Sequence, residues 1–304
     1  MKHASLPLPV PLARPVASTR PADLLALAKP RVNTLVVLTT AAGFYLASGN
    51  SIDLPRLLIT IAGTGLVAGG AAAFNQVSER ESDRQMHRTR MRPLADGRLE
   101  PQEATAFGLA LTIAGLAALG IGTNVRATVV ALATIVTYTA VYTPLKRRTW
   151  MSALVGAVPG ALPPLIGWAA ARDAVSAGGW ALFAIVFVWQ IPHVQAIAWM
   201  YRDDYQRAGF PVLSVTHPDG RRTAREVMVY ASALIPVSLG PAMLGLAGSL
   251  YVIGALVLGM LLWAAALRFA ARRTLNDARR LFLGSLVYLP LLWALLIADN
   301  VRLR

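Results

Sequence analysis

Three polar residues at regular spacing interrupt a chain that is otherwise rich in Leu, Ala, Val and Gly. Asn75, Glu79 and Asp83 occur in the segment NQVSERESDRQMHRTRMRPL, which contains no Gly or Pro before Pro93. On a continuous helix, residues four apart drift by about 40° per step, so these three side chains would line one face over about 12 Å. One amide and two carboxylates in a row suit a hard cation such as Mg²⁺, which prefers oxygen ligands.

Several arginines follow these acids, among them Arg88 and Arg92. Mg²⁺ is usually held by one or two carboxylates while substrate phosphates complete its shell, and guanidinium groups bind phosphate oxygens in bidentate fashion. The segment therefore predicts a magnesium–diphosphate site. A merely charged loop would explain the arginines, but it would not explain the four-residue spacing of the acids at a membrane boundary, where charge is costly.

A second acidic pair, Asp203 and Asp204, follows another apolar run and is expected on the same side of the membrane. Two acidic patches on different helices could bind metals that bridge one diphosphate. Six basic residues are expected on that side as well: Lys29, Arg31, Lys146, Arg147, Arg148 and Arg202.

His193, with Gln190 and Gln195, lies inside an apolar run. Polar residues within a membrane usually face a cavity or the bundle interior. Pro192 predicts a kink that frees a backbone carbonyl, so an ordinary hydrogen bond of His193 is one interpretation. A contact with a bound ligand is the other.

The elements that must position these residues are membrane helices. Only 14% of the 304 residues are charged, well below the roughly 25% typical of soluble domains. About 20 apolar residues span a bilayer. We therefore predict an all-α integral membrane protein with about nine transmembrane helices in one bundle, over residues 33–48, 57–74, 104–122, 127–142, 151–170, 178–198, 227–246, 250–267 and 281–298.

The basic residues behind the net charge of +14 lie mostly on one side of the predicted membrane spans. Of the 29 Lys and Arg, 24 fall in the N-terminal segment and in the loops after the second, fourth, sixth and eighth spans. By the positive-inside rule this predicts a cytoplasmic N-terminus and an external C-terminus. No basic, aromatic-rich soluble platform is present, so we expect no nucleic-acid partner.

The N-terminal residues and the cysteine count narrow the class further. Residues 1–22 are rich in Pro and lack an apolar stretch, which predicts a flexible cytoplasmic tail before a single membrane domain over 23–304. The absence of cysteine excludes disulfides, thiolate nucleophiles and Cys-based metal sites.

Several motifs together resemble a known family. NQVSERESD is similar to the first acidic motif of the UbiA-type intramembrane prenyltransferases, Asn-x-x-x-Asp/Glu-x-x-x-Asp. Six further stretches, over about residues 24–225, resemble the haem branch of that family, the protohaem IX farnesyltransferases. They are LAKPRV, RMRPL, YTPLKRRT, GALPPLIGW, WQIPH and DYQRAG.

The resemblance implies a central cavity in the bundle, Mg²⁺ dependence, and a position in the cytoplasmic (inner) membrane. It implies transfer of a farnesyl group from farnesyl diphosphate to a vinyl group of protohaem IX with addition of water, giving haem O. Haem A synthase or a terminal oxidase would take the product. The resemblance implies that Asn75, Glu79 and Asp83 bind the Mg²⁺–diphosphate, with Asp204, and Asp203 as a further candidate, on the opposite wall of the site. The implied candidates for diphosphate contacts are Lys29, Arg31, Arg88, Arg92, Lys146 and Arg147. His193 would lie beside the haem.

The sequence departs from the family pattern in two places. Position 152 is Ser where the pattern has Asn, and Ala208 stands four residues after Asp204, so the second acidic motif is incomplete. Two alternative functions follow from the residues. One is a prenyltransferase for an aromatic quinone precursor, which shares the acidic face. The other is a transporter, which predicts inverted repeats that the chain does not show.

Overall fold

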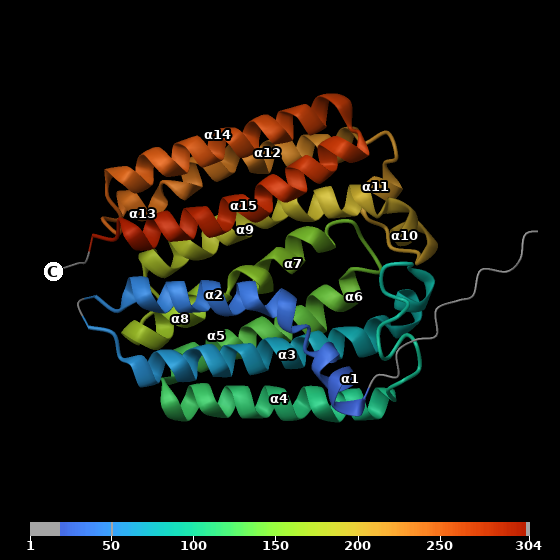
Figure 1. Ribbon diagram of the computed structural model, residues 1–304, viewed down its shortest axis with the longest axis horizontal. Coiled ribbons are helices and arrows are strands. Elements are labelled where there is room, and N and C mark those ends of the chain that lie inside the picture. Colours follow the sequence, from blue (N-terminus) through green and yellow to red (C-terminus); the bar gives the residue numbers. More distant parts are fainter. Residues whose placement is uncertain (1–18, 50, 302–304) are drawn as a thin grey trace, which may run out of the picture.

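The computed structural model describes residues 19–49 and 51–301, so most of the predicted N-terminal tail lies outside the described residues. These residues form helices only, arranged as one bundle (Figure 1). The helices are α1 (Arg20–Leu27), α2 (Pro30–Ala47), α3 (Leu54–Gln85), α4 (Pro101–Gly122), α5 (Val125–Val136), the π-helical turn η1 (Thr137–Tyr142), α6 (Thr143–Leu145), α7 (Ser152–Ala161), α8 (Pro163–Arg172), α9 (Ala177–Met200), α10 (Arg202–Arg207), α11 (Leu213–Thr216), α12 (Arg221–Ser238), α13 (Gly240–Met243), α14 (Ser249–Arg272) and α15 (Leu275–Ala298).

The expected membrane architecture is confirmed. Eight spans within the described residues are long and apolar enough to cross a membrane. Together with the 18-residue α2, they correspond to the nine predicted segments. The last turns of α3, which carry the first acidic patch, and the segment around α10 and α11, which carries the second, lie at the same end of the bundle, opposite the chain's C-terminal end (Figure 1).

Helix α3 is the element that carries the first acidic face. It begins at an N-cap, where the Asp53 side chain accepts a hydrogen bond from the backbone N–H of Arg56, and it continues without a break to Gln85. Its 32 residues correspond to about 48 Å of helix, whereas the hydrocarbon core of a bilayer is about 30 Å thick. The last turns therefore project beyond the apolar layer, as the sequence predicted.

The predicted fifth span is divided into α7 and α8 at Leu162, because Pro163 and Pro164 follow. Helix α8 lies directly against α2. A Cβ atom on Gly167 would collide with the backbone oxygen of Thr40, and one on Gly43 would collide with that of Pro164. Glycine at both positions therefore allows the two backbones to touch.

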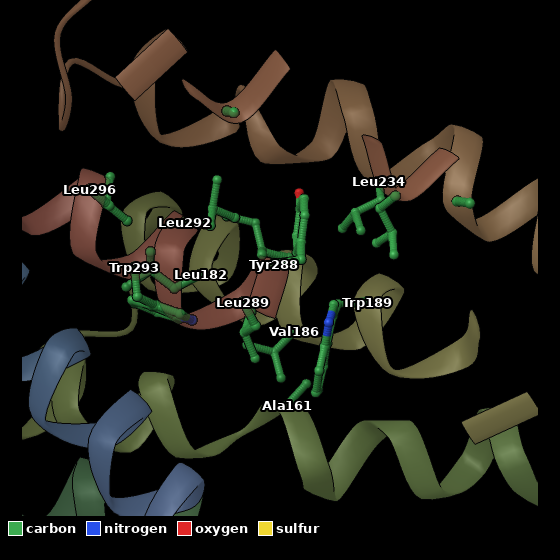
Figure 2. Close-up of a cluster of buried hydrophobic side chains, with 14 of the residues drawn as sticks. Ala161, Leu182, Val186, Trp189, Leu234, Tyr288, Leu289, Leu292, Trp293 and Leu296 are labelled. Carbon is green, nitrogen blue, oxygen red and sulfur yellow. The ribbon is translucent and has the colours of Figure 1, made fainter. Parts of the chain in front are cut away.

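The apolar core of the second half of the chain lies among α9, α12, α14 and α15. Figure 2 shows Trp189, Leu234, Tyr288 and Leu289 within this cluster. Two of its buried polar groups are paired: the Tyr288 hydroxyl lies 2.6 Å from Ser238 Oγ, and Trp189 Nε1 donates to the backbone oxygen of Ser285 at 2.9 Å. Through these contacts the cluster holds α9 in place and thereby helps to position α10, which follows it.

Candidate active site

The acidic face of α3 is buried. Asn75, Glu79 and Asp83 are 4%, 4% and 3% exposed, although they lie in the most polar part of the helix. Glu81 lies on a different face, is exposed, and pairs with Arg80 and Arg84. The shared face of the three residues follows from the four-residue spacing, and burial of two carboxylates in one row calls for nearby cations.

Three cations from separate parts of the chain meet this face. Lys146 Nζ lies 2.9 Å from Glu79 Oε1, and an Arg92 guanidinium nitrogen lies 2.7 Å from Asp83 Oδ2. Lys29 Nζ donates to Asn75 Oδ1 at 3.3 Å. Each acidic-face residue is thus held by one cationic side chain, and the three cations come from before α2, after α3 and after α6.

Lys29 occupies an unusual backbone position. Its φ of 47° lies in the left-handed region, because the chain turns sharply there between α1 and Pro30. Burial, aided by the positive charge of Arg92, lowers the pKa of Lys29 to about 7, against the opposing effect of Glu79. An anion bound nearby would favour the charged form of this lysine.

Lys146 behaves in the opposite way. Burial disfavours its charged form, but the adjoining Tyr142 and the Glu79 carboxylate more than offset this, so the pKa of Lys146 lies above its ordinary value. Lys146 is therefore a permanent cation beside Glu79. Its ammonium group also lies 4.8 Å from the ring centroid of Phe210, which helps to fix its position.

Asp204 fixes the loop between α3 and α4. Its carboxylate accepts hydrogen bonds from the backbone N–H groups of His87 and Arg88, at 3.3 and 3.2 Å, and it pairs with Arg207. The loop it holds is the one that brings Arg92 to Asp83. The sequence placed Asp204 on the opposite wall of the site, but no spacing in the sequence indicated these contacts with backbone groups.

The remaining predicted residues lie around this centre at varying distance from it. The Arg88 guanidinium stacks over the Tyr201 ring at 5.4 Å. Arg147 is exposed and donates to the backbone oxygen of Ser78. Asp203 is exposed near Arg202, and Arg31 is exposed on α2. The described contacts do not join Arg31 or Asp203 to the acidic face.

His193 lies on the side of α9 that meets α15. Its ring stacks on Trp189 with centroids 4.8 Å apart and lies 5.0 Å from Phe282. Its Nδ1 lies 2.8 Å from Ser285 Oγ, and the Ser285 hydroxyl donates to the Phe282 backbone oxygen. With that hydroxyl proton engaged, Ser285 Oγ accepts from Nδ1–H, which fixes the tautomer and leaves a lone pair on Nε2.

An apolar cavity adjoins Lys29, which contacts Asn75 on the acidic face. It has a volume of about 190 Å³ and is lined by Lys29, Val36, Ala68, Ala71, Tyr138 and Pro163, among others. Ala71 and Ala68 precede Asn75 by four and seven residues on α3, so they extend its face along the helix. The cavity could take a hydrocarbon chain whose polar end remains among the cations.

Tyr138 and Tyr142 were not predicted as part of the site. They lie in the π-helical turn η1, with ring centroids 5.3 Å apart. Pro144 lacks a backbone N–H and crowds the preceding turn, which accounts for the wider turn at this point. Tyr138 lines the apolar cavity, while Tyr142 lines a small pocket together with Lys146, Ser152, Gln195 and Tyr205. Ser152, the departure from the family pattern, is therefore buried next to the site.

The donor atoms at the acidic face suit Mg²⁺. Glu79 and Asp83 supply the carboxylate oxygens for the ion. The buried Asn75 amide N–H group, which has no hydrogen-bond acceptor among the described residues, could instead donate to a phosphate oxygen. Within the same residues, no group of three or more His, Cys, Asp or Glu side chains is placed to hold a metal alone. Two carboxylates fit a cation that shares its shell with phosphate oxygens and water.

The chain is similar to known proteins over most of its length. The model of the UbiA prenyltransferase family matches residues 36–296. A protoheme IX farnesyltransferase from Solibacter usitatus is 49% identical, over 91% of this chain and 98% of the relative. One from Koribacter versatilis is 42% identical, over 99% of each chain.

Solved structures share the fold. A digeranylgeranylglyceryl phosphate synthase structure aligns with a TM-score of 0.78 at 16% identity, covering 92% of this chain and 98% of that one. A UbiA homolog from Archaeoglobus fulgidus, bound to GPP and Mg²⁺, aligns with a TM-score of 0.63 at 17% identity, covering 91% and 99% of the two chains.

Proposed function

Because this chain belongs to the UbiA prenyltransferase family, we propose that it transfers the farnesyl group of farnesyl diphosphate to a vinyl group of protohaem IX, with addition of water, to give haem O. The observation that carries the proposal is the buried row of Asn75, Glu79 and Asp83, ringed by cations at the head of an apolar cavity. Relatives 38–49% identical over most of the chain are protoheme IX farnesyltransferases, which favours protohaem as the acceptor.

The diphosphate would lie between the acidic face and the three cations. Glu79 and Asp83 would hold Mg²⁺, with Asn75 beside it, and the bound ion would supply positive charge to the diphosphate. Asp204 remains a second metal candidate from the sequence. Since both of its oxygens accept hydrogen bonds from the loop, binding a metal there would require those contacts to move.

The side chains around the diphosphate would stabilise its departure. The bond between the allylic carbon and the diphosphate oxygen breaks, and the electron pair leaves with the diphosphate, next to Lys146, Arg92 and Lys29. Cations fixed before the reaction stabilise this developing charge without reorganising. The vinyl group supplies the electron pair for the new carbon–carbon bond, and water then adds to the other vinyl carbon and releases a proton. The chain needs no nucleophile of its own.

The apolar cavity would bind the farnesyl chain and keep water from the allylic carbon before the vinyl group reacts. An isoprenoid in this cavity would have its first carbon at the head, near Lys29. Arg88 and Arg147 would act at the edge of the diphosphate site, and Arg31 and Asp203 stay predictions from the sequence. His193 likewise stays a prediction from the sequence as a haem contact.

The setting in the cell follows from the same proposal. The protein is a multi-pass membrane protein, and we propose that it lies in the cytoplasmic (inner) membrane with its N-terminus in the cytoplasm and residues 23–304 as one domain. Haem A synthase or a terminal oxidase would receive the product. The quinone-precursor alternative shares the acidic face, but the relatives favour the haem branch.

An assay of the purified protein in detergent tests the function. The protein is incubated with protohaem IX, farnesyl diphosphate and Mg²⁺, and the product mass is measured. We expect protohaem plus farnesyl plus water, and loss of this product in Glu79→Gln. Glu81→Gln is the matched control, because Glu81 lies two residues away but is exposed. Prenylation of an aromatic acid in place of protohaem would refute the proposal.

A further inference from the structure

A second cavity opens beside α12, separate from the apolar cavity at Lys29. It has a volume of about 290 Å³. Its apolar wall includes Trp150, Leu213 and Tyr230, and its charged rim includes Arg222, Arg225 and Glu226. A cavity with aromatic and aliphatic walls and cations on its rim is suited to an amphipathic anion.

The two arginines of the rim have no ion-pair partner among the described residues. Arg222 and Arg225 are exposed on the first turns of α12 and form no ion pair or hydrogen bond with another described residue. The adjoining Arg221, by contrast, lies 3.7 Å from Asp219 and does not line the cavity. Guanidinium groups bind carboxylates in bidentate fashion, so this rim favours a ligand with carboxylates on one edge.

The cavity leads toward the diphosphate site. Trp150 and Leu213 also line the small pocket that contains Lys146 and Ser152. Gln195 lines that pocket and donates a hydrogen bond of 2.7 Å to Glu226, which lines the arginine cavity. A flat molecule held at the arginines would therefore point its far edge at Lys146, which contacts Glu79.

We infer that the cavity at Arg222 and Arg225 binds the carboxylate edge of the prenyl acceptor. This inference rests on the proposed function and adds the site of its second substrate. Protohaem IX has the required shape, since it is flat and apolar, with two propionates on one edge and its vinyl groups elsewhere on the ring. The propionates would stay at the arginine rim, while a vinyl group reaches the allylic carbon.

This placement differs from the sequence-based expectation for His193. His193 and Gln195 are two residues apart and project from nearly opposite sides of α9. Gln195 contacts Glu226 of α12, whereas His193 contacts Ser285 of α15. An acceptor that reaches Lys146 from the Gln195 side would not contact His193.

Acceptor binding can be tested in nanodiscs of zwitterionic phosphatidylcholine. Two constants are measured for protohaem IX and for its dimethyl ester, in which the propionates are masked. Kd is obtained from the absorbance of bound haem, and KM from the farnesylation assay. We expect Arg222→Gln and Arg225→Gln each to raise both constants for protohaem about three- to tenfold, and the double variant to raise them further. The preference for protohaem over the ester should disappear in the double variant. KM for farnesyl diphosphate should stay unchanged, and Arg221→Gln should behave as wild type.

Three outcomes would overturn the inference. The first is an unchanged Kd and KM for protohaem in the double variant while farnesylation continues, which leaves the proposed function standing. The second is an effect that appears only when anionic lipid is added, which would assign the arginines to lipid headgroups. The third is a raised KM for protohaem in His193→Ala without one in the double variant, which would place the acceptor on the α15 side. Failure of the wild type to farnesylate protohaem would instead refute the proposed function, and Kd would still report on the arginines.

Discussion

Lys146 and Glu79 are 67 positions apart in the sequence, yet Lys146 Nζ lies 2.9 Å from Glu79 Oε1, and both side chains are largely buried. A single buried charge at this place would be costly, because it would have neither solvent nor an opposite charge to stabilise it. A site that binds a metal and a diphosphate needs both signs of charge, and in this pair each charge stabilises the other before the substrates arrive.

Removal of one partner should therefore destabilise the protein. We expect Lys146→Gln, without Mg²⁺, to lower the free energy of unfolding by about 3 kcal/mol, since Glu79 is left buried and unpaired. Thermal unfolding in detergent measures this. Adding Glu79→Gln to the same variant should restore most of the loss, and a double variant as unstable as the single one would contradict the explanation.

Asp204 should act through the loop that it holds. We expect Asp204→Asn to raise KM for farnesyl diphosphate about tenfold, because two backbone N–H groups and Arg207 lose a charged acceptor and Arg92 is no longer held at Asp83. Cleavage of residues 86–100 by protease should become faster. Asp219→Asn, at an exposed ion pair, is the control. Fast cleavage with normal KM would separate the loop from diphosphate binding.

The apolar cavity should set the length of the isoprenoid. Ala68→Phe should lower kcat/KM for farnesyl diphosphate more than tenfold and that for geranyl diphosphate much less, because the larger side chain fills the part of the cavity far from the cations. Ala110→Phe, at an exposed position of α4, is the matched control. An equal loss with both diphosphates would indicate a general distortion of α3.

Lys29 should give stability a particular pH dependence. Its pKa of about 7 in the folded protein lies below the ordinary value, so between pH 7 and 10.5 the unfolded chain binds a proton that the folded chain does not. The burial of charged Lys29 therefore lowers the free energy of unfolding by its full amount below pH 7. This loss becomes progressively smaller as the pH rises to 10.5. Between pH 7 and pH 9, the midpoint of unfolding should therefore rise more in the wild type than in Lys29→Gln. Parallel shifts in both proteins would exclude this role.

Metal removal should abolish transfer and weaken diphosphate binding together. With chelator present, we expect no farnesylated product, and return of activity on addition of Mg²⁺. In Asp83→Asn the Mg²⁺ concentration for half-maximal activity should rise, because one of the two carboxylates on the α3 face is lost. Activity that persists in chelator would contradict a metal at this face.

The sequence predicted what depends on local periodicity. The nine spans follow from apolar runs of the right length, and the shared face of Asn75, Glu79 and Asp83 follows from their spacing on one helix. Contacts between distant segments could not be obtained in this way. Nothing local pairs Lys146 with Glu79, turns Asp204 toward the backbone of His87 and Arg88, or widens the helix at Tyr138. His193 illustrates the same limit, because its surroundings come from α15.

The unbroken course of α3 has a consequence for how substrates are chosen. One continuous helix carries both parts of the site. Ala68 and Ala71 line the apolar cavity, and Glu79 and Asp83 lie at the charged end of the same helix. The distance between the binding sites for the head and the tail of an isoprenoid is thus fixed by one helix. One helical turn, about 5.4 Å, is close to the length of one extended isoprene unit. Enlarging a side chain one turn nearer the charged end would therefore subtract about one unit from the accepted chain, while the diphosphate keeps its place.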